Sequence, residues 1–515
     1  MDRIKNVVNN IVFGVIQKIV MIVGPFWVRT ALIYQLTSQI AGINDLFTSI
    51  LLLLNLTELG LSNVIVYSMY KPIADNNYKT ICSLLNFYRK AYLWVGGGLF
   101  IIGSAITPFI TYLLKDNNST NINVLFVYFV FLFNSSISYL FFSYKTCLLT
   151  ANQRQDVISR NTTVVNVILY ALQISSLLCL KNYYVYICLL PLSTILLNLF
   201  NYKCASNLFP NVKCEGKISK NEFKEIKKSL YGILIWKIGL LSRNSFDNIV
   251  ITLYLSISLV AVYSNYMLLI NAVTGFFGIV LSSMIASIGN KVASNSVKEN
   301  YKDFCKFNLI YMLLSSWITI CLLCLIQPFM YLWMGRDLVL SDSALFLICI
   351  LFYLFRTGDI NSAYYHATGL WHKGRYRSII EAILNLILNL SLGYLFGIEG
   401  IILATIIAYC SVWFYSTGIV FKYYFKSFNV KSFYLQNFYY LFILTIVSGI
   451  TYYTCDLIEY SNNKFSLIVD FLIRILVSLF SLILLVIFYK NLKYYTEAYN
   501  FVKTILNKFL LKRFV

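Results

Sequence analysis

Lysine, arginine, aspartate and glutamate residues stand inside long apolar stretches of this sequence. An ionisable group at membrane depth is costly and suggests a function unless a neighbouring charge accounts for it. Three opposite-charge pairs are three or four residues apart, so each can neutralise itself on one helix face: Arg243 with Asp247, Arg356 with Asp359, and Asp470 with Arg474. Glu381 follows Arg375 and Arg377, and we expect it to form a salt bridge at the membrane edge.

Lys18 and Lys237 have no carboxylate three or four residues away. Each lies near the middle of the first apolar helix of one half of the chain, and Arg29 and Arg243 follow farther along the same two helices. We therefore expect these four cations to line a cleft between the halves. A cationic cavity with low-dielectric walls suits an anionic head group.

Three carboxylates could neutralise these cations: Asp45, Glu58 and Asp247. They could balance Arg29, or they could bind a coupling cation such as Na⁺ or a proton. Gly24-Pro25 predicts a kink in the first helix, because proline removes a backbone hydrogen bond and clashes with the preceding turn. The kink is either static or a hinge that bends during transport.

The elements that must position these residues are transmembrane helices. Of the 515 residues, 59% are hydrophobic and 12% are charged, and residues 92–114 and 307–333 contain no charge. About 20 apolar residues cross a bilayer as a helix, and the alternating pattern of a membrane barrel is absent. We predict an all-α polytopic membrane protein with about fourteen spans: 8–34, 41–69, 91–114, 122–147, 158–180, 182–202, 230–255, 258–288, 307–333, 343–365, 378–396, 398–421, 434–455 and 465–489.

The distribution of positive charge predicts the orientation. With the N-terminus placed in the cytoplasm, 32 of the 42 lysines and arginines fall in the cytoplasmic termini and connections or at their edges, and four fall in the outer connections. Basic residues collect on the cytoplasmic side of membrane proteins. This explains the net charge of +21 without nucleic acid. We expect a multi-pass protein of a bacterial inner or plasma membrane with both termini cytoplasmic.

The two halves of the chain are similar at an offset near 219 residues. This offset places residues 14–19 over residues 233–238, and Asn166 over Asn385. A six-helix repeat gives parallel halves, related by an axis along the membrane normal. We predict an N-terminal lobe over 1–215, a C-terminal lobe over 216–430, helices 13 and 14 within 431–489, and a basic amphipathic tail over 490–515 that lies on membrane lipid.

Other chemistry finds little support in the sequence. It has no GxxxxGK[ST] phosphate loop, so the chain cannot drive transport by hydrolysing a nucleotide itself. The two histidines stand without a ligand cluster, and the pair Cys321 and Cys324 lies in the middle of a span with no second pair. We expect no catalytic residue, no metal and no cofactor.

The sequence resembles bacterial polysaccharide-unit flippases (Wzx-type) of the multidrug/oligosaccharidyl-lipid/polysaccharide exporter superfamily. The resemblance covers nearly the whole chain and is most specific in the runs Glu58-Leu59-Gly60-Leu61-Ser62 and Tyr263-Ser264-Asn265-Tyr266. It implies a V-shaped pair of six-helix lobes that work by alternating access. The implied cargo is an undecaprenyl-diphosphate-linked oligosaccharide, moved from the cytoplasmic to the outer leaflet for capsule, O-antigen (lipopolysaccharide) or exopolysaccharide assembly. Basic cavity residues would hold the diphosphate, here Arg29 and Arg243.

Two other classes remain open. A cation-coupled multidrug exporter of the same superfamily would favour carboxylates in its cavity, whereas Lys18, Arg29, Lys237 and Arg243 repel cationic drugs. A polytopic glycan polymerase or ligase would need a substantial outer loop with catalytic groups, and the predicted outer connections have about ten residues or fewer. The expected partners are therefore membrane lipid, the lipid-linked cargo, and a polymerase or other polysaccharide-assembly protein.

Overall fold

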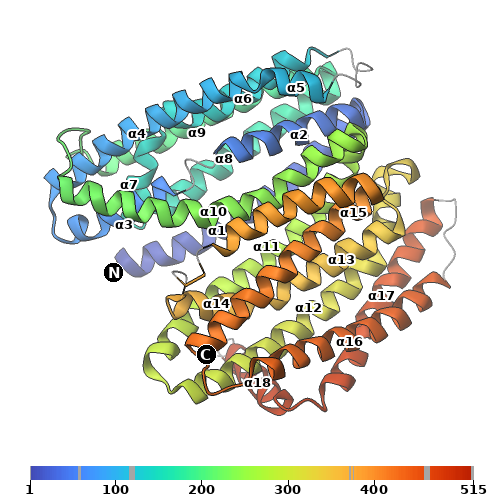
Figure 1. Ribbon diagram of the computed structural model, residues 1–515. Coiled ribbons are helices and arrows are strands. Elements are labelled where there is room, and N and C mark those ends of the chain that lie inside the picture. Colours follow the sequence, from blue (N-terminus) through green and yellow to red (C-terminus); the bar gives the residue numbers. More distant parts are fainter. Residues whose placement is uncertain are drawn as a thin grey trace. The chain divides into compact units, whose positions relative to one another are not determined.

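The computed structural model describes residues 2–55, 60–114, 122–370, 373–374, 376–457 and 464–511. Within these ranges it leaves out the side chains of residues 2–8, 232–244, 283, 286, 464–465, 505–506 and 508–511. Every regular element in the described ranges is a helix (Figure 1). Nine of these helices are long and apolar enough to cross a membrane, and two bent helix pairs raise the number to eleven. The prediction of an all-α polytopic membrane protein is confirmed.

Contacts group residues 1–264 into a first compact unit. Its helices are α1 (Asp2–Gln35), α2 (Ser38–Leu54), α3 (Leu61–Ala74), α4 (Tyr78–Ala105), α5 (Thr107–Leu113), α6 (Val124–Leu140), α7 (Thr146–Ala151), α8 (Gln155–Ser175), α9 (Tyr183–Leu208) and α10 (Lys220–Tyr254). The short 3₁₀ turn Ser143–Lys145 leads directly into α7, and the π turn Ser176–Leu180 continues α8.

Polar caps fix the starts of several of these helices. The side chains of Thr37, Asn77 and Asn182 accept hydrogen bonds from backbone N–H groups in the first turns of α2, α4 and α9. Ser219 and Glu222 form a reciprocal capping box at the start of α10. These bonds satisfy N–H groups that have no partner inside the helix, so the sequence sets where these four helices begin.

Residues 265–515 form the second unit. The helix α11 (Ile257–Ser294) begins in the first unit, and the second holds the rest of it together with α12 (Val297–Met334), α13 (Asp342–Thr357), α14 (Asp359–Ala367), α15 (Arg377–Tyr423), α16 (Val430–Asp456), α17 (Lys464–Tyr489) and α18 (Tyr495–Leu511). A buried apolar cluster, which includes Met312, Tyr353, Tyr440 and Leu485, joins α12 and α13 to α16 and α17. The predicted helices 13 and 14 therefore pack on the second unit.

The long helix α15 is a hairpin of two helices. Gly397 takes a non-helical conformation, with φ 62° and ψ −136°. The Asn385 side chain donates a hydrogen bond to the Thr405 hydroxyl at 2.9 Å, although 20 residues of continuous helix would separate the two by roughly 30 Å. The chain thus reverses at Gly397, as the separate spans 378–396 and 398–421 predict.

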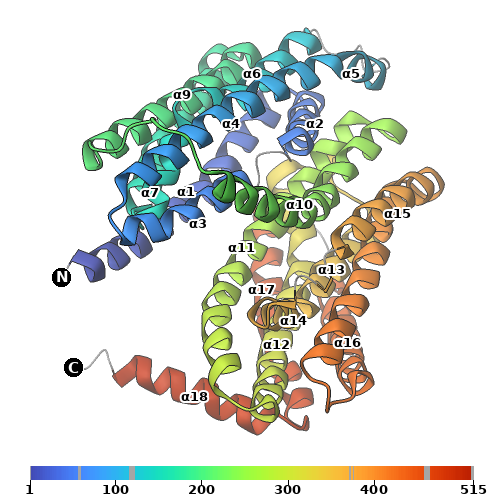
Figure 2. The same cartoon turned by 60° about the vertical axis from the view of Figure 1, so that its left-hand side comes forward.

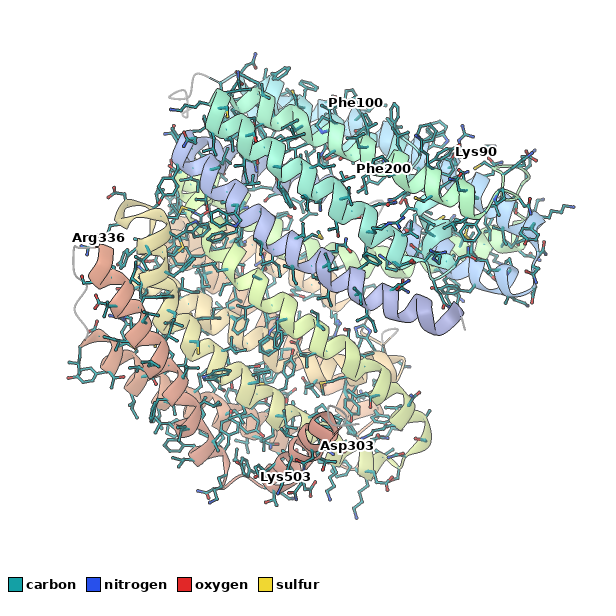
Figure 3. The ribbon with its side chains drawn as sticks, turned by 180° about the vertical axis from the view of Figure 1, so that it is seen from behind. Lys90, Phe100, Phe200, Asp303, Arg336 and Lys503 are labelled. Atoms are coloured by element: carbon teal, nitrogen blue, oxygen red, sulfur yellow. The ribbon has the colours of Figure 1, made fainter. Side chains whose placement is uncertain are left out.

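The C-terminal helix α18 packs on the beginning of α12. Lys302 forms an ion pair with Glu497 at 2.9 Å, and the rings of Phe307 and Phe501 meet at 5.5 Å. Figure 2 shows α18 crossing the end of the second unit, and in Figure 3 the labelled Asp303 and Lys503 lie at that same end. The contact-based boundary falls after Ser264. The predicted lobes, divided after residue 215, stay a prediction.

Candidate functional site

A buried arginine joins three helices in the first unit. The Arg29 side chain on α1 is 8% exposed, and its two terminal nitrogens contact the two Asp45 carboxylate oxygens on α2 at 3.0 and 2.8 Å. Arg29 Nη2 also donates to the Ala261 carbonyl on α11 at 3.0 Å. The first contact is a hydrogen bond and the second is an ion pair, and a hydrogen bond between charged groups is roughly twice as strong as a neutral one. We call Arg29, Asp45 and the Ala261 carbonyl the arginine latch.

The backbone of α2 is positioned for this contact by a glycine. A Cβ added at Gly42 would lie 1.9 Å from the Ile257 carbonyl oxygen at the start of α11. Only glycine permits an approach this close. Gly42 stands one turn before Asp45. The close approach of α2 to α11 at this glycine therefore also brings the Asp45 carboxylate next to α11.

A second buried contact ties α10 to the same helices. Tyr263 on α11 donates its hydroxyl proton to Asp247 on α10 at 3.0 Å, and the Asp247 side chain is almost fully buried. The neighbouring Asn248 donates its amide to the Ser49 hydroxyl on α2 at 2.9 Å. Buried polar groups need such partners, because leaving one unsatisfied costs roughly 1–3 kcal/mol. Four helices thus meet through polar side chains in this unit.

Two tyrosines of α9 lie near the latch. Tyr183 and Tyr186 are both buried, and their rings stack at 5.8 Å. Tyr186 lies within electrostatic reach of both Arg29 and Asp45. Burial of the latch strengthens the attraction between its charges.

The other predicted site residues are not all brought to this cluster. Lys18 is exposed on α1, roughly 16 Å before Arg29 along the helix. Lys237 and Arg243 belong to α10, but their side chains lie outside the described residues, as does Glu58. The binding of a head group by Lys18, Arg29, Lys237 and Arg243 stays a prediction, and so does a coupling role for Asp45, Glu58 or Asp247.

Gly24 and Pro25 lie within an uninterrupted α1. A Cβ at Gly24 would meet the Tyr170 ring of α8 at 2.1 Å, so this glycine permits close packing between α1 and α8. Its role as a hinge stays a prediction.

The second unit holds two further buried polar groups. Arg356 forms an ion pair with Asp359 at 3.1 Å, and Tyr311 donates to the same carboxylate at 2.5 Å. The self-neutralising pair predicted from the spacing is therefore present. On the α15 hairpin, Asn389 donates to Asn385 at 3.3 Å, which continues the bond from Asn385 to Thr405.

Sequence reasoning missed several of these residues. It assigned no role to Tyr263, Ser49 or Asn385, since uncharged polar residues are common in membrane helices and their partners are distant in sequence. The run Tyr263-Ser264-Asn265-Tyr266 was the one available signal. Lys145, inside the predicted span 122–147, also had no assigned role, although it is buried and donates to the Ser206 hydroxyl at 2.7 Å.

The described side chains contain no cluster of histidine, cysteine, aspartate and glutamate that could hold a metal ion. The site is instead a closed polar contact between α1, α2, α10 and the start of α11.

The fold belongs to a known class of transporter structures, although no family model and no curated protein sequence matches the chain. Solved structures of the MOP superfamily, the multidrug/oligosaccharidyl-lipid/polysaccharide exporters, align with most of it. The chain is therefore a multi-pass membrane protein with the MOP transporter fold.

Among these structures is the lipid II flippase MurJ in an inward-closed conformation. It has a TM-score of 0.67 and 16% identity, and the match covers 93% of this chain and 99% of that one. An inward-facing multidrug resistance transporter of the MATE family has a TM-score of 0.62 and 15% identity, covering 78% and 93%. A MOP transporter from Pyrococcus furiosus, whose binding pocket is described as reversed in polarity, has a TM-score of 0.52 and 15% identity, covering 81% and 96%.

Proposed function

We propose that this protein flips an undecaprenyl-diphosphate-linked oligosaccharide from the cytoplasmic to the outer leaflet of a bacterial cell membrane by alternating access. The observation that supports this most is the extent of the match to the lipid II flippase, which covers 93% of this chain. The drug-exporter structure covers 78%. The chain thus shares more of its elements with the lipid II flippase than with this drug exporter.

The arginine latch supplies a way for such a cargo to act on the protein. Arg29 is held by one carboxylate and one carbonyl, and a diphosphate offers more negative charge and more acceptor oxygens than Asp45 alone. A diphosphate that reaches Arg29 would compete with Asp45 and with the Ala261 carbonyl. Releasing both would free α1 from α2 and α11, which is the kind of differential contact that shifts a conformational equilibrium.

A cation-coupled multidrug exporter is the second candidate, and the exporter structure at a TM-score of 0.62 favours it. The charges of the first unit argue against it. Lys18 lies exposed on α1, and an exposed cation repels cationic drugs.

Export assays on single variants test the proposal. In a strain whose own copy is deleted, Arg29→Ala should reduce surface polysaccharide at least about tenfold, since it removes the group that exchanges partners. Lys90→Ala is the matched control, because Lys90 is an exposed cation on α4. Protein levels are compared in membranes. Full export by Arg29→Ala at normal protein level would contradict the role of the latch.

A further inference from the structure

One exposed helix face in the first unit, on α3, differs from the apolar pattern expected of a face in contact with lipid. On α3 the exposed side chains are Asn63, Tyr67, Tyr70, Lys71 and Ala74, and all five fall within about 100° of the helix circumference. The Tyr67 side chain is 76% exposed and Tyr70 is 48% exposed. The opposite side of α3, including Val64, Ile65 and Met69, is buried.

The lipid-facing pattern of this protein is seen on α17. Over its residues 466–489, whose side chains are described, the exposed ones are all aliphatic or phenylalanine: Ile468, Val469, Leu472, Ile473, Leu476, Leu479, Phe480, Ile483, Ile487 and Phe488. Figure 3 shows the same character at Phe100 and Phe200, on α4 and α9. Hydrocarbon offers no partner to an amide or ammonium group, so exposed faces in lipid are apolar.

Tyrosine and lysine also gather where a membrane meets water. The α3 face could therefore lie at the membrane surface, or it could border water deeper in the membrane, and the position of Asn63 distinguishes these two explanations. Asn63 lies eight residues before Lys71, so its amide is roughly 12 Å deeper along the helix than the ammonium group. An exposed amide at that depth indicates that the face of α3 borders water and not lipid.

The two tyrosine rings form a continuous aromatic surface on this face. They meet edge to face with their centroids 6.3 Å apart, at an angle of 78°. Exposed aromatic rings bind the apolar C–H faces of sugar rings, while neighbouring amide, hydroxyl and ammonium groups bind sugar hydroxyls. Asn63 and Lys71 flank the rings on the same face. In addition, α3 packs against α10, the helix that carries Lys237 and Arg243.

We propose that Asn63, Tyr67, Tyr70 and Lys71 on α3 form a binding surface for the sugar part of the cargo, which we call the glycan platform. This inference rests on the proposed function and adds where the oligosaccharide binds, apart from its diphosphate. A chain of several sugars needs such a surface, because the cationic residues recognise only the head group.

Binding of two lipids to the purified full-length protein tests the platform. The probes are undecaprenyl diphosphate, which has no sugar, and the undecaprenyl-diphosphate-linked repeat unit extracted from the source bacterium. The Tyr67→Ala/Tyr70→Ala variant should bind the sugar-bearing lipid about tenfold more weakly and undecaprenyl diphosphate unchanged. Tyr67→Phe/Tyr70→Phe keeps both rings and should retain binding of each lipid within about twofold.

Trp94→Ala is the matched control, because Trp94 is an 83% exposed aromatic residue on the neighbouring α4. It should leave binding of both lipids unchanged. Equal weakening for both lipids in the double alanine variant, or unchanged binding of the sugar-bearing one, would overturn the platform. If the unsubstituted protein binds neither lipid, the proposed function fails and the platform with it. If it binds both and only Arg29→Ala weakens them, the proposed function stands and the platform does not.

Discussion

Arg29 shows what a single residue contributes and what its sequence position conceals. The sequence alone shows that a cation lies inside an apolar span and that Asp45 is one of its possible partners. Both residues can be recognised because they are charges in an apolar stretch. The sequence cannot show the third member of the latch, the Ala261 carbonyl. That group is 232 residues away, and a backbone carbonyl is the same whatever the residue type. Backbone acceptors are invisible to sequence patterns.

At the residue scale, we predict that Asp45→Asn destabilises the protein by roughly 3–5 kcal/mol, because it leaves the Arg29 charge buried without a carboxylate. The double variant Arg29→Met/Asp45→Leu should regain most of this stability, since well-packed apolar residues can replace a buried ion pair. Thermal unfolding of the purified variants measures both effects. The double variant should still fail to export polysaccharide. Equal stability of Asp45→Asn and the unsubstituted protein would show that the pair is not needed in the folded state.

At the element scale, glycines and polar caps determine how the helices meet. The sequence predicts spans 11 and 12 as separate helices on either side of Gly397, and the Asn385–Thr405 hydrogen bond bears this out. It does not predict the approach of α2 to α11 at Gly42, because a glycine inside an apolar stretch has no distinguishing neighbours. The same limit applies to the exposed face of α3. The sequence gives its residue types, but only the packing of the helix shows which side is exposed.

Substitution of two glycines of α15 by alanine should change the stability of the protein in opposite directions. Gly397→Ala should destabilise the protein by roughly 1–3 kcal/mol, because φ is 62° and ψ is −136° there and a side chain strains this conformation. Gly418→Ala should stabilise it by up to about 1 kcal/mol, since that glycine is inside the helix and no atom stands within 4 Å of an added Cβ. Melting temperatures of the two variants in one detergent compare them directly. A rise for Gly397→Ala would contradict a hairpin turn at this position.

At the scale of the whole molecule, composition and charge predict the architecture better than they predict the site. The all-helical membrane architecture follows from apolar runs long enough to cross a bilayer, and the structure confirms it. The helices α16 and α17, predicted as an appended pair, pack on α12 in the second unit. The division into two lobes and the orientation depend on how the chain sits in a membrane, so they stay predictions from the offset of the repeat and from the positive charges.

Reporter fusions measure the orientation. A fluorescent protein that folds only in the cytoplasm should fluoresce when fused to either terminus, because both termini and their lysines are expected on that side. Alkaline phosphatase, which is active only outside, should be inactive at both positions and active when inserted after Lys181, in a predicted outer connection. Activity at a terminus would reverse the orientation and, with it, the direction of transport that we propose.

The most direct test of the central claim is the location of the lipid-linked oligosaccharide after the protein is depleted. In spheroplasts, a membrane-impermeant glycosidase or lectin reports the sugar on the outer leaflet, and total extraction reports the whole pool. We predict that depletion makes undecaprenyl-diphosphate-linked repeat units accumulate while the share accessible from outside falls at least about tenfold. An unchanged accessible share, with normal surface polysaccharide, would contradict the flippase function.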